Sequence, residues 1–307
     1  MMKPAKEGYV QGLLEAAAFD NRVIVIDGDV SRSTGTVRFR EKYPNRFFNL
    51  GIAEQNMAEY CAGLALTGFM PFYSTYAAFA VGRALDQIRT SICNMNLPVR
   101  IGGAHSGTGT GPDGATHQAL EDIACMRVMP NMTVLVPADA NQTAAAVKAS
   151  LEIDGPVYIR YGRNPVPEIY EPDKPVKPGR GCLLREGRHA GIVAAGSMVA
   201  RALEAAESLS AYGIETSVAD MVSVKPLDTD LLDFLSGSGV LVTAEDHQIK
   251  GGLFGAVTEY CGQRGNTRVI PVGVQDRFGC SGTPDEVMED CGLTAKNIVE
   301  KVRESLT

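Results

Sequence analysis

The sequence predicts an α/β protein made of two doubly wound domains with mainly parallel sheets. Short apolar runs alternate along the chain with segments of helical periodicity, as in βα units. A proline-rich segment divides this pattern near the middle. The chain has 307 residues, 45% of them hydrophobic, which is long for one domain and sufficient for two buried cores.

The first half contains the clearest pattern. Residues 22–27 are apolar on both faces, as a strand inside a parallel sheet requires. Further strands are expected at 98–104, 132–136 and 157–161. Helices are expected at 8–19, 53–66, 77–93, 118–128 and 139–152. We therefore assign residues 1–165 to the first domain.

Five prolines between Pro165 and Pro178 indicate an interdomain linker, placed at 166–184. The βα rhythm then resumes, and residues 185–307 are assigned to the second domain. Strands are expected there at 190–195, 215–219, 240–244 and 269–274, and helices at 199–211, 229–235, 252–263 and 294–305.

Composition excludes several functional classes. The net charge is −7 and no basic patch is present, which argues against a nucleic-acid partner. The seven cysteines include no C-x-x-C pair, which argues against a zinc site and a disulfide framework and favours a cytoplasmic protein with reduced thiols. The N-terminus lacks the apolar run of a signal peptide, and no run of about 18 apolar residues predicts a membrane span.

Glu54 is a single carboxylate in the otherwise uncharged segment 49–57, at the expected start of a helix. A carboxylate in the first helical turn can simply complement the helix dipole. A buried carboxyl can instead hold or share a proton near neutral pH. The residues alone leave both interpretations open.

A second polar group is predicted downstream. His105, Asp113 and His117 lie in one glycine-rich loop after an expected strand, and the chain has only four histidines. Loops at the carboxyl ends of parallel strands are where α/β proteins bind ligands. Tyr76 and Phe79 have the spacing of one helical face, which also suits ordinary core packing.

The segment 52–57, Ile-Ala-Glu-Gln-Asn-Met, is similar to the stretch of transketolases that carries their cofactor glutamate. The resemblance extends over the chain from about residue 8. It implies that Glu54 hydrogen-bonds N1′ of the aminopyrimidine of thiamine diphosphate, and that Tyr76 and Phe79 contact that ring. Arg83 resembles a residue of the deoxyxylulose phosphate synthase branch, which adds it to the cofactor-binding candidates. The same resemblance makes His105 and His117 catalytic candidates.

The resemblance also implies roles in substrate binding. His105, Arg163 and Ser33 match residues that hold the donor phosphate, and Asp113 matches the residue that contacts the C2 hydroxyl. Without the resemblance, Arg163 could be a surface arginine and Ser33 a helix N-cap. The loop departs from the family pattern, because Gly114-Ala115-Thr116 stands where Gly-Pro-Thr is usual.

Transketolases hold their Mg²⁺ with a Gly-Asp-Gly motif and a later Asn. This chain has Gly28-Asp29-Val30 and no Gly-Asp-Gly elsewhere, so no metal ligand is assigned to it. The resemblance therefore implies a C-terminal subunit that needs an N-terminal partner carrying those ligands. We expect an α2β2 assembly containing a homodimer of this chain, sugar phosphate substrates and transfer of a two-carbon ketol unit.

Two other functions stay open at this point. One is the β subunit of a 2-oxo-acid dehydrogenase first component, which shares the size, the architecture and the need for a partner. The other is a non-catalytic regulatory paralogue.

The segments around Val224–Asp228 and Glu245–Gln248 also match family patterns, and we interpret them, His247 included, as structural or interfacial.

Overall fold

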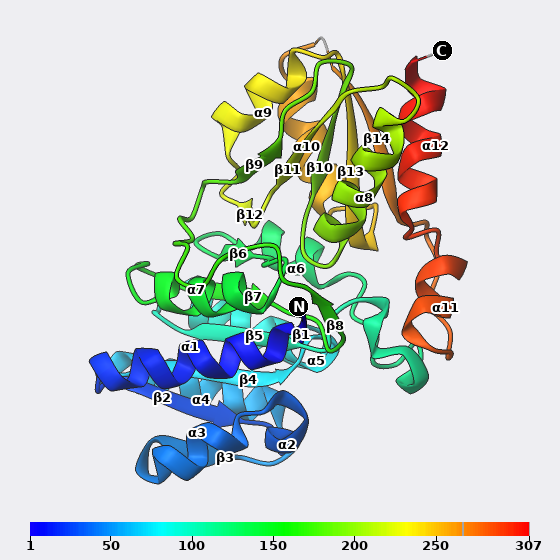
Figure 1. Cartoon of the computed structure of the whole chain (residues 1–307). Coiled ribbons are helices and arrows are strands. Elements are labelled where there is room, and N and C mark those ends of the chain that lie inside the picture. The colour runs from blue at the N-terminus through cyan, green and yellow to red at the C-terminus, as the bar shows by residue number, and fades with distance from the viewer. Residues whose placement is uncertain (266, 307) are drawn as a thin grey trace.

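Three sheets organise the chain in a computed structural model that describes residues 1–265 and 267–306 (Figure 1). The seven-stranded sheet has the order β12-β6-β7-β5-β4-β2-β3, and the five-stranded sheet has the order β14-β13-β10-β11-β9. In the first, the strands are β12 (Ser223–Lys225), β6 (Thr133–Leu135), β7 (Val157–Arg160), β5 (Arg100–Ala104), β4 (Met70–Tyr76), β2 (Val23–Asp27) and β3 (Phe47–Asn49). In the second, they are β14 (Arg268–Val274), β13 (Val240–Gln248), β10 (Ala190–Ala194), β11 (Thr216–Asp220) and β9 (Cys182–Arg185). A two-stranded sheet pairs β1 (Met2–Pro4) with β8 (Pro165–Pro167).

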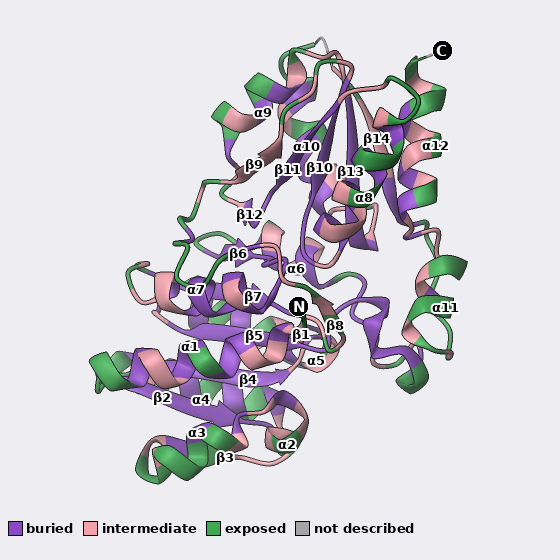
Figure 2. Ribbon diagram, in the orientation of Figure 1, coloured by how far each residue is buried: buried purple, intermediate pink, exposed green. Residues whose placement is uncertain are grey.

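Helices cover both faces of the seven-stranded sheet. On one face lie α1 (Ala5–Phe19) and α7 (Ala140–Ser150), which share a core with Val23, Val25 and Phe72. On the other lie α4 (Glu54–Leu66), α5 (Ala77–Gln87) and α6 (Asp122–Val128). The strands are buried almost throughout (Figure 2), because both faces are covered.

The five-stranded sheet is built in the same way. The helices α8 (Met198–Ser210) and α12 (Ala295–Leu306) pack on one face, and α9 (Thr229–Ser236) and α10 (Leu253–Gly262) pack on the other. The short helix α11 (Pro284–Asp290) leaves this unit and packs against a loop of the first one. The predicted fold class, two mainly parallel α/β domains, is confirmed.

Several short strands were not predicted. β9 and β12 are each antiparallel to their neighbours, and β12 comes from the second half of the chain but pairs with β6 of the first sheet. Within the predicted proline-rich linker, β8 forms a short ladder with β1. Such strands of three or four residues are too short to show a period in the sequence.

Several shorter elements lie between the strands. They are the helices α2 (Ser31–Thr34) and α3 (Val37–Lys42), and the 3₁₀ segments η1 (Pro44–Arg46) and η3 (Thr108–Asp113). The expected helix 77–93 is divided, because α5 has a non-helical residue at Ala84 and continues as a π-helix, η2 (Ile88–Cys93). Within the described residues, no helix is long and apolar enough to cross a membrane.

Candidate active site

Glu54 is the first residue of α4, and its side chain is 2% exposed. Arg83 Nη1 donates to both carboxylate oxygens at 3.1 Å. Arg83 comes from α5, and its side chain is 47% exposed. The site thus holds a buried carboxylate whose ion-pair partner reaches it from solvent.

Aromatic rings lie beside this pair. The guanidinium of Arg83 stacks 4.0 Å from the centre of the Phe79 ring. The Tyr76 and Phe79 ring centres are 5.9 Å apart, and His117 stands edge-on to Phe79 at 5.1 Å. The prediction that Tyr76 and Phe79 share a helical face was wrong, because Tyr76 ends strand β4 and only Phe79 is helical. The turn from β4 into α5 nevertheless brings the two rings together.

His105 follows the end of β5 and has a left-handed backbone, with φ of 54°. Its ring centre is 4.4 Å from that of Tyr76. The side chain is buried, and its Nδ1 atom has no hydrogen-bond partner among the described residues. A non-glycine residue with positive φ and an unpaired buried nitrogen is typical of a functional site.

Burial lowers the pKa of His105 to about 4, and the nearby positive charges of Arg163 and Lys6 act in the same direction. The imidazole is therefore neutral at pH 7. A neutral ring has one donor and one acceptor nitrogen, so it can accept a proton or hydrogen-bond a hydroxyl group.

The candidate phosphate residues lie around this ring. Arg163 Nη1 donates to Asp113 Oδ2 at 3.0 Å, so two residues with different predicted partners form an ion pair with each other. Both are more than one-third exposed. Lys6 donates to the Ser33 carbonyl oxygen at 3.2 Å. Sequence reasoning missed Lys6, because a single lysine in the first turn of a helix has no distinctive pattern.

The loop that carries His105 and Asp113 belongs to the first domain and is hydrogen-bonded to the second. Thr108 in this loop donates its amide and its hydroxyl to Asp246 Oδ1, both at 2.9 Å. Gln118 Nε2 donates to the Cys280 carbonyl oxygen at 2.9 Å. Sequence analysis did not predict these contacts, since Asp246 lies 138 residues from Thr108.

A buried ion pair lies beneath the loop. Arg160 Nε donates to Asp122 Oδ2 at 2.8 Å, and the Tyr158 hydroxyl donates to the same oxygen at 2.6 Å. Arg160 Nη2 donates to the carbonyl oxygens of Ala119 and Asp246. Burial acts to raise the pKa of Asp122, but Arg160 and the other partners outweigh it, and the pKa lies below its usual value.

His247 belongs to the same buried region. Its side chain is fully buried, and burial lowers its pKa to about 4. The Ala124 amide donates to its Nε2 at 3.4 Å. His247 lies with the buried Asp122–Arg160 pair, and its nearest charged neighbours are Asp122 and Glu245.

Comparisons with known proteins identify both domains of the chain. The transketolase pyrimidine binding domain matches residues 5–168, and the transketolase C-terminal domain matches residues 179–298. The chain is 39% identical to a transketolase C-terminal section of Methanocaldococcus jannaschii, covering 99% of this chain and 96% of that one. It is also 39% identical to a 6-deoxy-6-sulfo-D-fructose transketolase subunit of Clostridium sp. strain MSTE9, covering 97% and 93%.

A solved structure is similar along its whole length. It is described as a split gene transketolase in an inactive β4 tetramer. It is 48% identical to this chain and covers 99% of it and 98% of its own length, with a TM-score of 0.93. These matches confirm the resemblance found in the sequence: the chain belongs to the transketolase family and contains its pyrimidine-binding and C-terminal domains.

Proposed function

We propose that this chain is the catalytic C-terminal subunit of a two-subunit transketolase that depends on thiamine diphosphate. It would transfer a two-carbon ketol unit from a ketose phosphate to an aldose phosphate. The observation that carries this proposal is the buried carboxylate of Glu54, which lies beside aromatic rings and has a partially exposed partner.

The residues present suit the aminopyrimidine end of the cofactor. Glu54 offers a carboxyl to a ring nitrogen, and the rings of Tyr76 and Phe79 offer apolar surfaces to a flat heterocycle. When bound, thiamine diphosphate supplies the nucleophilic carbon and the electron sink of the reaction. The chain's own contribution is to orient the ring and to hold a proton at N1′ through Glu54.

Arg83 sets the condition under which Glu54 can do this. Both oxygens of the Glu54 carboxylate accept from Arg83 Nη1 in this structure. To share a proton with a ring nitrogen, the Glu54 carboxyl needs Arg83 to shift away from it. Because nearly half of the Arg83 side chain is exposed, the guanidinium can move toward solvent at small cost. We therefore assign Arg83 to cofactor binding through Glu54.

The donor phosphate is assigned to Arg163, His105 and Ser33. Arg163 and Lys6 together make the environment of His105 positive, which favours an anion there. Asp113 would leave Arg163 and accept from the C2 hydroxyl group of the sugar. His117, beside Phe79, would bind the sugar and move protons.

The Mg²⁺ ligands are assigned to a separate N-terminal subunit that carries Gly-Asp-Gly and Asn. Several small residues of α4 and α5 are buried inside this chain, including Ala58, Ala62 and Ala80. Gly63 and Gly82 differ, because an added Cβ at either would meet nothing within 4 Å. These two positions on α4 and α5 leave room for a partner helix, and we propose an α2β2 assembly around them.

The first experiment compares the chain alone with the reconstituted pair. The chain alone should show no ketol transfer, and activity should appear when a subunit with Gly-Asp-Gly and Asn is added with thiamine diphosphate and Mg²⁺. Robust transfer by the chain alone would refute the partner requirement. Decarboxylation of a 2-oxo acid by the pair, without ketol transfer, would favour the dehydrogenase alternative, and neither activity would favour a regulatory paralogue.

Light scattering on the co-purified pair tests the assembly. The proposal requires two copies of each subunit, because a site shared across an interface needs an extensive and persistent contact. An active αβ heterodimer would contradict it.

A further inference from the structure

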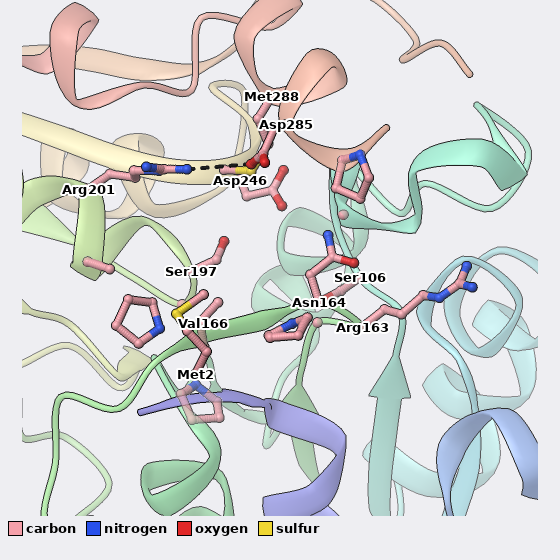
Figure 3. Close-up of a pocket in the computed structure, with 18 of the residues that line it drawn as sticks. Met2, Ser106, Arg163, Asn164, Val166, Ser197, Arg201, Asp246, Asp285 and Met288 are labelled. Atoms are coloured by element: carbon pink, nitrogen blue, oxygen red, sulfur yellow. Dashed lines mark ion pairs between the residues drawn. The ribbon is translucent and has the colours of Figure 1, made fainter. Parts of the chain in front are cut away.

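A cavity of about 630 Å³ lies between the two domains, separate from the rings around Glu54 (Figure 3). One wall comes from the segment 162–167 and from Ser106 and Gly109. The other comes from the start of α8, from Asp246 on β13 and from α11. Arg163 lines it at the edge, with its guanidinium directed away toward Asp113.

The cavity lies where a doubly wound sheet commonly binds ligands. β10 pairs with β11 on one side and with β13 on the other, so the strand order reverses at β10. Ligands of such folds bind outside the carboxyl ends of the strands at this reversal. Gly196 and Ser197 follow the end of β10, and Asp246 lies near the end of β13.

Two buried polar side chains that line the cavity have unused hydrogen-bonding capacity. Asp246 is 6% exposed, and both Thr108 bonds go to its Oδ1, which leaves Oδ2 without a donor among the described residues. Ser106 is 4% exposed, and its backbone amide donates to the Tyr161 carbonyl oxygen, so its hydroxyl is the group that it can offer to the cavity. Both residues line the cavity, so these two oxygen atoms can hydrogen-bond hydroxyl groups of a ligand.

The other end of the cavity suits an anion. Ser197 is the N-cap residue of the 13-residue helix α8, and its side chain makes no capping hydrogen bond. Arg201, one turn further along α8, is 40% exposed and, among the described residues, forms ion pairs with the exposed carboxylates of Glu204 at 3.3 Å and Asp285 at 3.6 Å. Exposed pairs of this kind are weak, so Arg201 can bind another anion. A helix N-terminus with an arginine and a free hydroxyl is a typical phosphate site.

We propose that this cavity binds a small phosphorylated polyol. Its phosphate lies at the start of α8, against Ser197 and Arg201, and its hydroxyl groups lie against Asp246 and Ser106. Val136, Val166 and Met288 supply apolar contacts for the carbon chain. This ligand site is distinct from the sugar phosphate site proposed around His105.

Calorimetric titration of the purified chain with ribitol 5-phosphate tests the proposal, because this probe has no carbonyl group to react. Ala200→Leu places a larger side chain at the cavity wall and should abolish binding. Arg201→Ala should weaken binding about tenfold, the size expected for one charge-assisted contact. Glu54→Gln and His117→Ala, which alter the other site, should bind as the wild type does.

Circular dichroism should show that Ala200→Leu is folded, and Arg201→Ala carries the test if it is not. Absence of binding to the wild type would overturn the proposal. Binding that survives both cavity variants, or is lost in His117→Ala, would place the ligand elsewhere and overturn it too. Equal affinity for inorganic phosphate would mean an anion site only, without recognition of the polyol.

Discussion

The ion pairs Asp122–Arg160 and Glu54–Arg83 each contain a buried carboxylate, and they differ in how far the arginine is exposed. Asp122 and Arg160 are 1% and 5% exposed, and hydrogen bonds from both domains surround them. Glu54 is equally buried at 2%, but its partner Arg83 is 47% exposed. The arginine of one pair is buried, whereas the arginine of the other is open to solvent.

The difference separates a structural pair from the pair to which we assign a function. Arg160 donates to Asp122 and to two carbonyl oxygens, so this pair is held by contacts within the chain. Arg83 is the one side chain that donates to the Glu54 carboxylate within residues 1–265 and 267–306. A buried carboxylate with a single removable partner is suited to proton exchange with a bound ring.

The largest expected effect concerns the enclosed pair. Arg160→Ala should lower the free energy of unfolding by about 3–5 kcal/mol, because it leaves the Asp122 charge buried and unpaired. Arg83→Ala, its matched control, should lower it by less, because loss of that half-exposed side chain opens the Glu54 carboxylate to water. Urea unfolding of both variants measures this. Equal losses would show that the two pairs do not differ in kind.

A second prediction concerns the open rim of the site, where Arg163 is 44% exposed. Arg163→Ala should raise KM for phosphorylated donors by an amount equivalent to about 1.5–3 kcal/mol, the cost of losing a charge-assisted contact. Unphosphorylated donors should be little affected. Arg180→Ala, which removes an arginine that is also exposed and ion-paired, is the control. An equal rise in KM for both donor classes would contradict the assignment of Arg163 to the donor phosphate.

A third prediction concerns the pH dependence of stability, through the buried Asp220. Burial raises the pKa of Asp220, which accepts from Tyr170 and Gln142, from 3.8 to about 7. Because the folded pKa lies above the unfolded one, its contribution to stability is present at low pH and is lost as the pH rises toward 7. Between pH 5 and 7.5 the wild type should lose about 2 kcal/mol relative to Asp220→Asn in urea unfolding. Parallel pH profiles of the two proteins would contradict this.

The sequence predicted features that have a local pattern and missed contacts between distant residues. Residues 52–57 indicated a carboxylate at a helix start, and Glu54 begins α4. The apolar runs predicted β2, β5, β6 and β7, because their pattern is local, but β4 between β2 and β5 was not predicted. Arg83 pairs with a residue 29 positions away, and Thr108 pairs with Asp246 across 138 positions. No local pattern encodes such contacts, so the partner of Glu54 and the support of the His105 loop needed the structure.

The central claim is that Glu54 is the proton-holding residue, and Glu54→Gln in the reconstituted pair tests it most directly. Glutamine preserves size and hydrogen bonding but cannot exchange a proton. With saturating cofactor, kcat should fall on the order of 10²-fold or more while the free energy of unfolding changes little. A Glu54→Gln enzyme that keeps a near-wild-type kcat would contradict the account.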